Sequence, residues 1–585
     1  MTANGKFHNI RHIFLPWWKY GKGFLFCNCL ISVLLGPIAG FFSATLGQAV
    51  IEELQQSNSI GACVFIGFVY FLIAITCMMV KASVEDLYLR WKRQDIEGKI
   101  GIEIYKKACS TDYKSLDDPE YYDSYKLATE EYVEKSSEVV DYIFKFIEEM
   151  TKMIVYGTLI SVHHFGLFIL VFLCSIVAAT AQIYWSSVSA KRSIKMVRQR
   201  RVIDYIRRLF FNKTSVADMR ISNVKRSLLK HYTENIDDCV SVYKEFSRKE
   251  VLIDFLVSFA QYGTVLCVPI FAATVIISDG IAGIAVFSTL VASSMALKES
   301  LNAIGWWGSQ INMGLSYFNN VVKFFDTESP IENTLEGASP ADGPFDIEFE
   351  NVFFKYSNSD FRLENLNLHI KPGEKIAIVG ENGVGKSTIT KLLLRLYDVD
   401  EGRIKINRED IQKYNITQLR SKIGVAFQDS SLYAMSVKEN LCTYSLKEDS
   451  ELMDALETVG LDIDIHNVVT KEFDEKGVVL SGGEEQKLCL ARLLCGEFGL
   501  VILDEPSSAL DPIAEFNLTK VMFDNIKSTT IMISHRLSTV VNADRIILIS
   551  DGCILEEGNH KDLLSLKGKY AEMFEKQAAA YVKQY

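Results

Sequence analysis

The chain has 585 residues, of which 49% are hydrophobic, and its formal net charge is −11. This length suggests more than one domain, and a mean hydropathy of +0.12 in so long a chain indicates membrane-spanning segments. The mild acidity argues against nucleic acid as a partner. The twelve cysteines show neither repeated CxxC spacing nor a Cys/His cluster, so we expect reduced packing residues rather than disulfides or a zinc site.

Apolar residues concentrate in the first half of the chain, in six runs that we interpret as membrane-spanning helices. The runs are 24–51, 60–80, 139–161, 165–184, 251–277 and 281–297. The short connections within each pair of runs carry no Lys or Arg, whereas the long connections 81–135 and 191–249 are rich in both. Because Lys and Arg mark the cytoplasmic side, both termini and both long connections are predicted to be cytoplasmic. Helical periodicity in the long connections predicts that the membrane helices extend into the cytoplasm.

The character of the sequence changes near Asp326. Residues 326–345 are rich in Pro, Gly, Ser and acidic residues and carry no apolar face, which predicts a linker. Beyond it, apolar strands such as "KIAIV", "LVILDE" and "TTIMIS" alternate with helices, as is typical of an α/β nucleotide-binding domain. We therefore predict a six-helix membrane domain over 1–325, a linker over 326–345 and a nucleotide-binding domain over 346–585. Both termini of the chain and the nucleotide-binding domain are predicted to be cytoplasmic.

The stretch "IVGENGVGKSTITKLLLRL" fits the phosphate-binding pattern G-x-x-x-x-G-K-[ST], between an apolar strand and a helix. Its glycines let the backbone close around phosphates, Lys386 reaches the outer phosphates, and the Ser387 hydroxyl can ligate magnesium. The predicted nucleotide-binding residues of this loop are Gly380, Glu381, Asn382, Gly383, Val384, Gly385, Lys386, Ser387 and Thr388.

The run "LVILDE" places two acids at the end of a buried strand, directed at the same phosphates. Asp504 would hold the magnesium shell through water, and Glu505 would orient and activate the attacking water. An apolar strand that ends in two acids is weak evidence alone. Together with the phosphate-binding loop upstream, it indicates nucleotide hydrolysis.

A second anion-binding feature follows about a hundred residues beyond the phosphate-binding loop, in "VVLSGGEEQKLCLARLL". Ser481, Gly482 and Gly483 precede a stretch of helical periodicity, and free backbone N–H groups at a helix start attract anions. The first loop already accounts for one nucleotide, so the sequence alone leaves the occupant of this second feature open.

On these motifs the chain resembles the ABC transporters, over nearly its whole length. The most specific mark is LSGG at 480–483, which resembles the signature motif of that family. The resemblance implies that two nucleotide-binding domains pack head to tail, so that Ser481, Gly482 and Gly483 of one domain close over the ATP bound by the other. The implied partner is a second half-transporter, and an identical chain is favoured because the half-sites look competent.

Other residues match the family singly. Tyr356 resembles the aromatic residue that stacks on adenine, Gln428 the glutamine that contacts Mg²⁺ and water, and Asp511 the residue that links the two sites across the dimer. His535 resembles the histidine at the γ-phosphate. The resemblance thus implies a catalytic set of Glu505, His535 and Lys386, and Mg²⁺ ligands from Ser387, Gln428 and Asp504. One departure is Glu484, where the family usually has Gln; it adds a negative charge near a bound triphosphate.

The sequence says less about the substrate. Glu148, Glu149 and Lys152 share one helix face, and we weigh two interpretations. In the first the charges lie within the membrane, where they face a water-filled cavity or partners within the helical bundle; in the second the helix is shifted and they pair with one another in the cytoplasm. In exporters the sixth helix lines the cavity. The candidate substrate path comprises Glu148, Glu149, Lys152, Asn302 and Trp306.

The predicted function is ATP-driven export of peptides or amphipathic small molecules across the plasma membrane by alternating access, performed by a dimer of half-transporters in contact with membrane lipid. One alternative is a lipid flippase. Another, from a different class, is a membrane-anchored ATP-binding sensor without transport, which the intact hydrolytic groups disfavour. The apolar runs exclude a soluble ABC ATPase.

Overall fold

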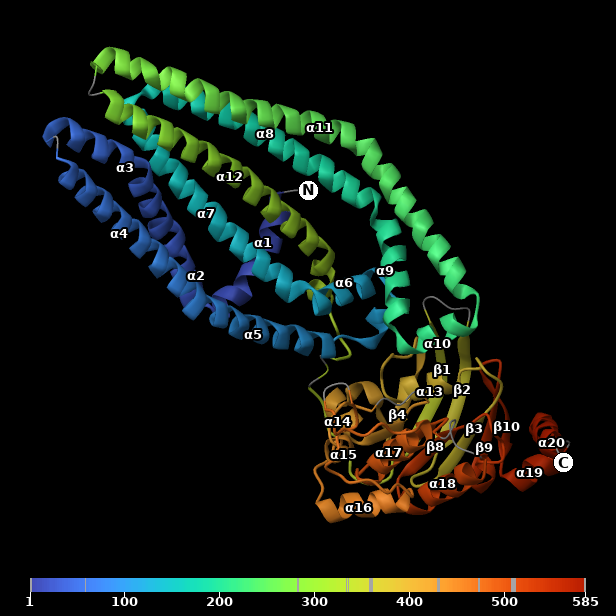
Figure 1. The fold of residues 1–585 in the computed structure, drawn as a ribbon. Helices are drawn as coiled ribbons and strands as arrows, with labels where there is room; N and C mark the ends of the chain where they lie inside the picture. Colours follow the sequence, from blue (N-terminus) through green and yellow to red (C-terminus); the bar gives the residue numbers. More distant parts are fainter. Residues whose placement is uncertain are drawn as a thin grey trace. The chain divides into compact units, whose positions relative to one another are not determined.

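The computed structural model describes residues 3–57, 59–280, 283–332, 334, 336–356, 361–428, 432–471, 474–506 and 512–582. The chain divides into two compact units. The helical unit comprises Met1–Ala108 and Asp123–Asp326, and the α/β unit comprises Cys109–Tyr122 and Thr327–Tyr585. The predicted fold class, a helical N-terminal domain followed by an α/β domain, is confirmed (Figure 1).

The helical unit begins with α1 (Ala3–Tyr20) and is dominated, in its described part, by six long helical runs. The runs are α2–η1–α3 (Lys22–Leu30, Ile31–Leu35 and Gly36–Ser57), α4–η2–α5 (Ile60–Val84, Glu85–Leu89 and Arg90–Cys109), α7 (Tyr132–His163), α8 (Phe165–Lys195), α11 (Val224–Asp279) and α12 (Gly283–Asp326). Both η1 and η2 are single π-helical turns. Shorter elements connect the runs: α6 (Pro119–Glu130), α9 (Val197–Phe211) and α10 (Lys213–Ile221). The 3₁₀ turn η3 (Tyr113–Asp117) and the first residues of α6 lie in the segment Cys109–Tyr122, which belongs to the α/β unit.

The predicted apolar runs fall in these long helices, but the helices differ in how well they suit a membrane. Among the described residues, three stretches are long and apolar enough to span one: Lys22–Gln56, Ile60–Cys109 and Gly283–Asn319. Phe165–Val177 in α8 is a shorter apolar helix. The number of six spanning helices therefore stays a prediction.

Helix α7 is central to the packing of the helical unit, because it packs against both α12 and α3. Its buried side chains Tyr156 and Ile160 join an apolar cluster with residues of α3, α8, α11 and α12. Small residues permit close approach: a Cβ added to Gly40 would lie 2.3 Å from the Tyr156 hydroxyl oxygen. Tight packing through small residues is how helices associate where no water drives them together.

The α/β unit is built on a six-stranded sheet of order β10-β9-β3-β8-β7-β6. The strands are β3 (Lys375–Val379), β6 (Ile423–Ala426), β7 (Leu500–Asp504), β8 (Thr529–Ile533), β9 (Arg545–Ser550) and β10 (Cys553–Gly558), and all neighbours pair in parallel except β9 and β10. Successive side chains of a strand point to opposite faces. Accordingly, Val501 and Leu503 join one buried core, while Leu500 and Ile502 join the other. Burial on both faces explains the uninterrupted apolar runs.

The remaining elements cover the two faces of this sheet. An antiparallel sheet of order β2-β1-β4-β5 is formed by β1 (Ile347–Lys355), β2 (Arg362–Ile370), β4 (Glu401–Ile406) and β5 (Glu409–Asp410). The helices are α13 (Lys386–Leu393), α14 (Ile416–Ser421), α15 (Val437–Leu441), α16 (Asp449–Thr458), α17 (Gly482–Leu494), α18 (Pro512–Asn525), α19 (His560–Leu566) and α20 (Lys569–Val582), with 3₁₀ turns η5 (Ile411–Lys413) and η6 (Val540–Asn542). Strands β1, β2 and β4 contribute to one core and helices α15 to α18 to the other.

The first half of segment 326–345, which is predicted to be a linker, is held by contacts within the α/β unit. The buried carboxylate of Asp112 accepts hydrogen bonds from the backbone N–H groups of Ile331 (3.3 Å) and Glu332 (2.9 Å). The N–H of Asp112 donates in turn to Ser329 Oγ at 3.3 Å. Composition predicted a segment without an apolar face, which is wrong at two positions: besides these polar contacts, the side chains of Ile331 and Phe345 are buried in the core of the α/β unit.

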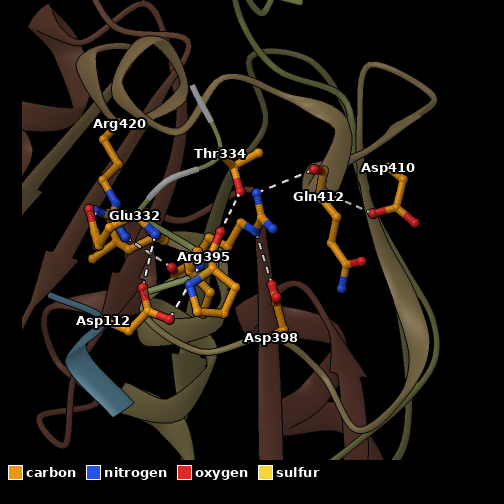
Figure 2. A network of polar contacts seen from close by, with 11 residues as sticks. Asp112, Glu332, Thr334, Arg395, Asp398, Asp410, Gln412 and Arg420 are labelled. Atoms are coloured by element: carbon orange, nitrogen blue, oxygen red, sulfur yellow. Dashed lines mark hydrogen bonds and ion pairs between the residues drawn. The ribbon is translucent and has the colours of Figure 1, made fainter. Parts of the chain in front are cut away.

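The same network continues to the helix that follows the phosphate-binding loop (Figure 2). Glu332 forms an ion pair with Arg420 at 2.7 Å, and Arg420 donates to the backbone carbonyls of Leu394 (2.9 Å) and Arg395 (3.0 Å), just after α13. Buried Arg395 pairs with Asp398 at 2.9 Å. Segment 109–122, the linker and the end of α13 are therefore joined by hydrogen bonds within one unit.

We predict that Asp112→Ala loosens the linker. Without the carboxylate, the N–H groups of Ile331 and Glu332 lose their acceptor, at a local cost of about 1–3 kcal/mol. Hydrogen–deuterium exchange of peptides that cover 327–338 should then rise by about tenfold. Asp112→Asn, which keeps one acceptor oxygen, should show a smaller rise, and unchanged exchange in Asp112→Ala would contradict the anchoring role.

Candidate functional site

A cleft of about 590 Å³ lies at the carboxyl ends of β3, β6, β7 and β8. It is lined by Tyr356, Phe361, Asn382, Gly383, Gly385, Lys386, Ser387, Thr388, Lys391, Gln428, Glu505 and His535. Most of these are residues that the sequence motifs predicted, separated by up to about 180 positions along the chain. The parallel sheet brings them together because each follows the end of a neighbouring strand or lies in the adjoining loop and helix.

The phosphate-binding loop has a backbone shape that requires glycine. Gly385 has φ 103°, and a Cβ there would lie 2.4 Å from the ring of Phe361. Lys386 starts α13, and its Nζ donates to the carbonyls of Gly380 (3.0 Å) and Glu381 (2.8 Å). Burial lowers the pKa of Lys386, while the nearby carboxylates of Glu505 and Asp504 oppose that shift. The ammonium group is thus positioned by the loop and faces the cleft.

The residues predicted to bind magnesium fit that ion. Asp504 at the end of β7 is buried and accepts a hydrogen bond from Ser387, so two oxygen donors are adjacent. Burial raises the pKa of Asp504, and the hydrogen bond from Ser387 counteracts that rise. Gln428 adds an amide oxygen to the same cleft. An all-oxygen donor set of this kind is what Mg²⁺ prefers.

Glu505 and His535, two of the predicted catalytic residues, lie side by side in the cleft. His535 Nδ1 lies 3.1 Å from Glu505 Oε1, and Glu505 is 14% exposed against 46% for His535. Glu505 has φ 49°, a left-handed conformation that is uncommon for residues other than glycine, and its N–H donates to Ile533 O at 3.0 Å. Such backbone strain clusters at functional sites, where the surrounding structure holds it. Here the β7–β8 pairing holds the carboxylate toward the cleft.

The loop of His535 is also held from α20. Gln577 donates through Nε2 to the carbonyl of His535 at 2.8 Å and accepts from the N–H of Leu537 at 2.9 Å. Both contacts are to backbone atoms, so they fix the path of the loop and leave the imidazole exposed toward the cleft. The C-terminal helix therefore positions a predicted catalytic residue.

Tyr356, the predicted adenine-stacking residue, sits in an aromatic cluster. Its ring packs edge-to-face on Phe354 and Tyr397, with centroid distances of 4.9 and 5.3 Å, and its hydroxyl lies 3.2 Å from Thr388 Oγ1. Lys391 Nζ lies 5.4 Å from the Tyr356 ring centre. The cluster restricts the ring of Tyr356 before any ligand binds, so stacking costs little side-chain entropy.

Sequence reasoning missed Lys391 and Phe361 as cleft residues. Lys391 lies one helical turn beyond Ser387 on α13, so the i, i+4 spacing could have indicated it. Phe361 follows a segment outside the described residues, and no motif marks it.

The signature residues do not line this cleft as far as the chain is described. Ser481 is the N-cap of α17: its hydroxyl and its N–H both donate to Glu484 Oε2 at 2.8 Å, and the N–H of Glu484 lies 3.4 Å from Ser481 Oγ. This is a reciprocal capping box. The hydrogen bonds from Ser481 lower the pKa of Glu484. Glu484, the residue that departs from the family pattern, thus accepts the hydroxyl hydrogen bond of Ser481, the predicted anion-binding serine.

The candidate substrate-path residues lie on two helices that pack together, α7 and α12. Lys152 pairs with Glu148 at 2.9 Å and with Glu149 at 2.8 Å, and Lys81 of α4 pairs with Glu148 at 3.0 Å. Trp306 on α12 is 44% exposed and Asn302 is partly buried. The charges therefore pair with one another, which both interpretations of α7 allow. Asp511, the predicted dimer-coupling residue, lies outside the described residues.

Comparison with known proteins supports the motifs. Residues 363–508 match the family described as ABC transporter. ATP-binding cassette sub-family B member 6 of Mus musculus is 38% identical over 291 residues, which are 47% of this chain and 34% of that protein. The ATP-dependent lipid A-core flippase of Escherichia coli (strain K12) is 34% identical over 299 residues, 50% of either chain.

A third relative is the mitochondrial iron-sulfur clusters transporter ATM1 of Candida glabrata, 35% identical over 288 residues, which are 48% of this chain and 40% of that protein. The chain thus spans half or less of the length of the curated relatives it matches. A solved structure of a bacterial Atm1-family ABC exporter with ATP bound has a TM-score of 0.74 and 22% identity, and the match covers 95% of this chain and 98% of that chain. This likeness shows a shared fold over both units.

We predict that Tyr356→Ala weakens ATP binding by about 5- to 150-fold, because stacking of a base on an aromatic ring contributes about 1–3 kcal/mol. Tyr356→Phe keeps the ring and removes only the hydroxyl contact with Thr388, so its affinity should stay within about threefold of wild type. Equilibrium binding of a fluorescent ATP analogue measures both. Equal losses in the two variants would contradict the stacking role.

Proposed function

We propose that this chain, an exporter-type ABC half-transporter in its motifs and fold, hydrolyses ATP to drive export across a membrane. The observation that carries the proposal is the convergence of Lys386, the Asp504–Ser387 pair and the Glu505–His535 pair at one edge of the parallel sheet. These groups provide phosphate binding, metal coordination and water activation, the three requirements of phosphoryl transfer to water.

In this proposal each residue acts on a different part of the reaction. Lys386 and the backbone N–H groups of 380–385 bind the phosphates, and Tyr356 stacks on adenine. Ser387, Gln428 and Asp504 would hold Mg²⁺, which neutralises charge on the phosphates when it is bound. Glu505 orients the attacking water and accepts its proton, while His535, 3.1 Å from Glu505, donates to the γ-phosphate.

A second half-transporter completes the site. We infer that Ser481, Gly482 and Gly483 of one chain close over the ATP of its partner, and that Asp511 links the two sites. The fold shared with an ABC exporter supports this arrangement, as does the placement of the signature outside the chain's own cleft. An identical chain is the favoured partner, because the motifs of both half-sites are intact in this sequence.

ATP binding would close two nucleotide-binding domains, and the helical units would then change from an inward-facing to an outward-facing state. A ligand shifts such a two-state element only through its different affinity for the two states. Charged Glu148, Glu149 and Lys152, with Asn302 and exposed Trp306, suit a peptide or an amphipathic small molecule as cargo. We propose the plasma membrane as the location, with both termini and the α/β unit in the cytoplasm.

Two alternatives make different predictions. A lipid flippase, the activity printed in the name of one relative, would be stimulated by lipid rather than by peptides. A membrane-anchored sensor would bind ATP without turnover, although such a protein has no need of Glu505.

The first test is ATPase activity of the full chain in lipid, wild type beside Glu505→Gln. Loss of the general base should reduce turnover by about 10²- to 10⁴-fold with ATP binding retained. Glu572→Gln, an exposed acid on α20 that pairs with Lys576, is the matched control and should hydrolyse ATP as wild type does. Equal turnover in wild type and Glu505→Gln would contradict the proposed role of Glu505 as general base, and ATP binding without wild-type turnover would favour the sensor.

We also predict that Glu484→Gln strengthens ATP-dependent pairing of two chains. Gln keeps an acceptor for Ser481 but removes the negative charge beside the partner's triphosphate, so the apparent KM for ATP should fall roughly two- to fivefold. Hydrogen bonds hold the pKa of Glu484 below its ordinary value of 4.5, so the carboxylate is charged throughout pH 6–8 and the ratio of KM values should be constant there. An unchanged KM would argue against Ser481 contacting the partner's nucleotide.

A further inference from the structure

A second cavity, of about 330 Å³, lies within the helical unit where α2, η1, α4, η2, α5 and α7 meet. Four basic side chains line it: Lys81, Arg90, Arg93 and Lys145. We name it the basic cavity. It is separate from the ATP cleft, and of the candidate substrate path it includes only Glu148.

The basic cavity contains more positive groups than its own acids neutralise. Lys81 pairs with Glu148 at 3.0 Å, and Arg93 pairs with Asp141 at 2.5 Å. The acid that remains in the lining is Glu85. When these two pairs are set aside, Arg90 and Lys145 remain with Glu85 as the one acid. The lining therefore has one net positive charge.

The basic side chains that line the cavity are only partly paired within the protein. The buried Nε of Arg93 has no hydrogen-bond partner, although its Nη2 bonds Asp141. Lys145 makes no ion pair among the described residues, and its Nζ lies 4.7 Å from the centre of the Trp307 ring. Arg90 has only a long contact of 3.7 Å with exposed Asp86. An unpaired buried donor in a charged cavity is costly unless a ligand or water accepts from it.

The depth of the cavity matches that of a lipid headgroup. Helix α4 is apolar from Ile60 to Val80, and Lys81 is its first charged residue. At 1.5 Å per residue this apolar stretch is roughly 30 Å long, the thickness of a bilayer's hydrocarbon core. Lys81 therefore lies at the boundary where phosphate groups of phospholipids are located.

The surface beside the cavity is suited to acyl chains. Met78 and Met79, just before Lys81, are 71% and 63% exposed, and Leu87 in η2 is 75% exposed. The cavity is also bordered by both π-helical turns, since Ile31 of η1 and Leu89 of η2 line it. π-Helical turns occur frequently at functional sites, because the extra residue re-aims neighbouring side chains.

We propose that the basic cavity binds the phosphate of an anionic membrane phospholipid, with its acyl chains against the exposed apolar face of α4. The phosphate would accept from Arg90, Lys145 and the guanidinium group of Arg93, which line the cavity. Guanidinium groups suit this role, because their fork of N–H donors matches the phosphate oxygens. The bound lipid would contribute one negative charge to a lining with one excess positive charge.

The test uses the full chain in detergent, stripped of lipid and titrated with phosphatidylglycerol or with phosphatidylcholine of the same acyl chains. Native mass spectrometry counts the retained lipid. The test variant is R90Q/K145Q, at two exposed positions whose replacement leaves the buried pair of Arg93 and Asp141 intact. The matched control is K22Q/K106Q, which removes the same charge from exposed positions of the helical unit outside the cavity.

Wild type and K22Q/K106Q should prefer phosphatidylglycerol, and R90Q/K145Q should lose about tenfold in affinity for that lipid only. Glu85→Gln, which removes the opposing carboxylate, should bind it more tightly. Equal losses in the two double variants, or no preference in wild type, would overturn the proposal. Displacement of phosphatidylglycerol by millimolar inorganic phosphate would assign the cavity to a soluble anion instead. Basal ATP turnover in the same samples reports separately on the proposed function.

Discussion

The buried parallel sheet of the α/β unit is the constraint on which the ATP cleft depends. A parallel sheet places the carboxyl ends of neighbouring strands at one edge, so the residues after β3, β6, β7 and β8 must meet there. Its strands are covered on both faces, which fixes their register: a slip of one residue would move Ile502 out of one core and Val501 out of the other. The positions of Asp504 and Glu505 follow from that register.

The helical unit obeys a different constraint, namely that charge inside a helical bundle must be neutralised locally. Glu148 contacts both Lys81 and Lys152, and the backbone of α3 begins at Gly36, where a Cβ would lie 2.5 Å from a Glu148 oxygen. The absence of a side chain at Gly36 gives the carboxylate room to reach both cations. Removing one partner of such a group leaves the other uncompensated, so these residues act as a set.

Local patterns predicted the parts of the fold that depend on local physics. The phosphate-binding loop, the apolar strands and the two acids after β7 are all defined within short windows of sequence. Ser481 and Glu484 also show the S-x-x-E spacing of a capping box, a signal that could have identified the role of Glu484. The role of Asp112 was out of reach, because it comes from contacts with Ile331 and Glu332, which are far away in the chain. The contact of Tyr397 with Asp117, 280 positions away, is of the same kind.

Residues 109–122 belong to the α/β unit although they lie within the stretch of sequence that supplies the helices. The chain therefore passes between the units three times, at 108/109, 122/123 and 326/327. A fragment that begins at residue 346 would lack Asp117, the acceptor for the buried Tyr397 hydroxyl at 2.8 Å, and Tyr113, whose ring packs on Tyr397. The α/β unit is thus not self-contained from residue 346 onward: without segment 109–122 it would expose the aromatic surface of Tyr397, whose ring packs on Tyr356 in the cleft.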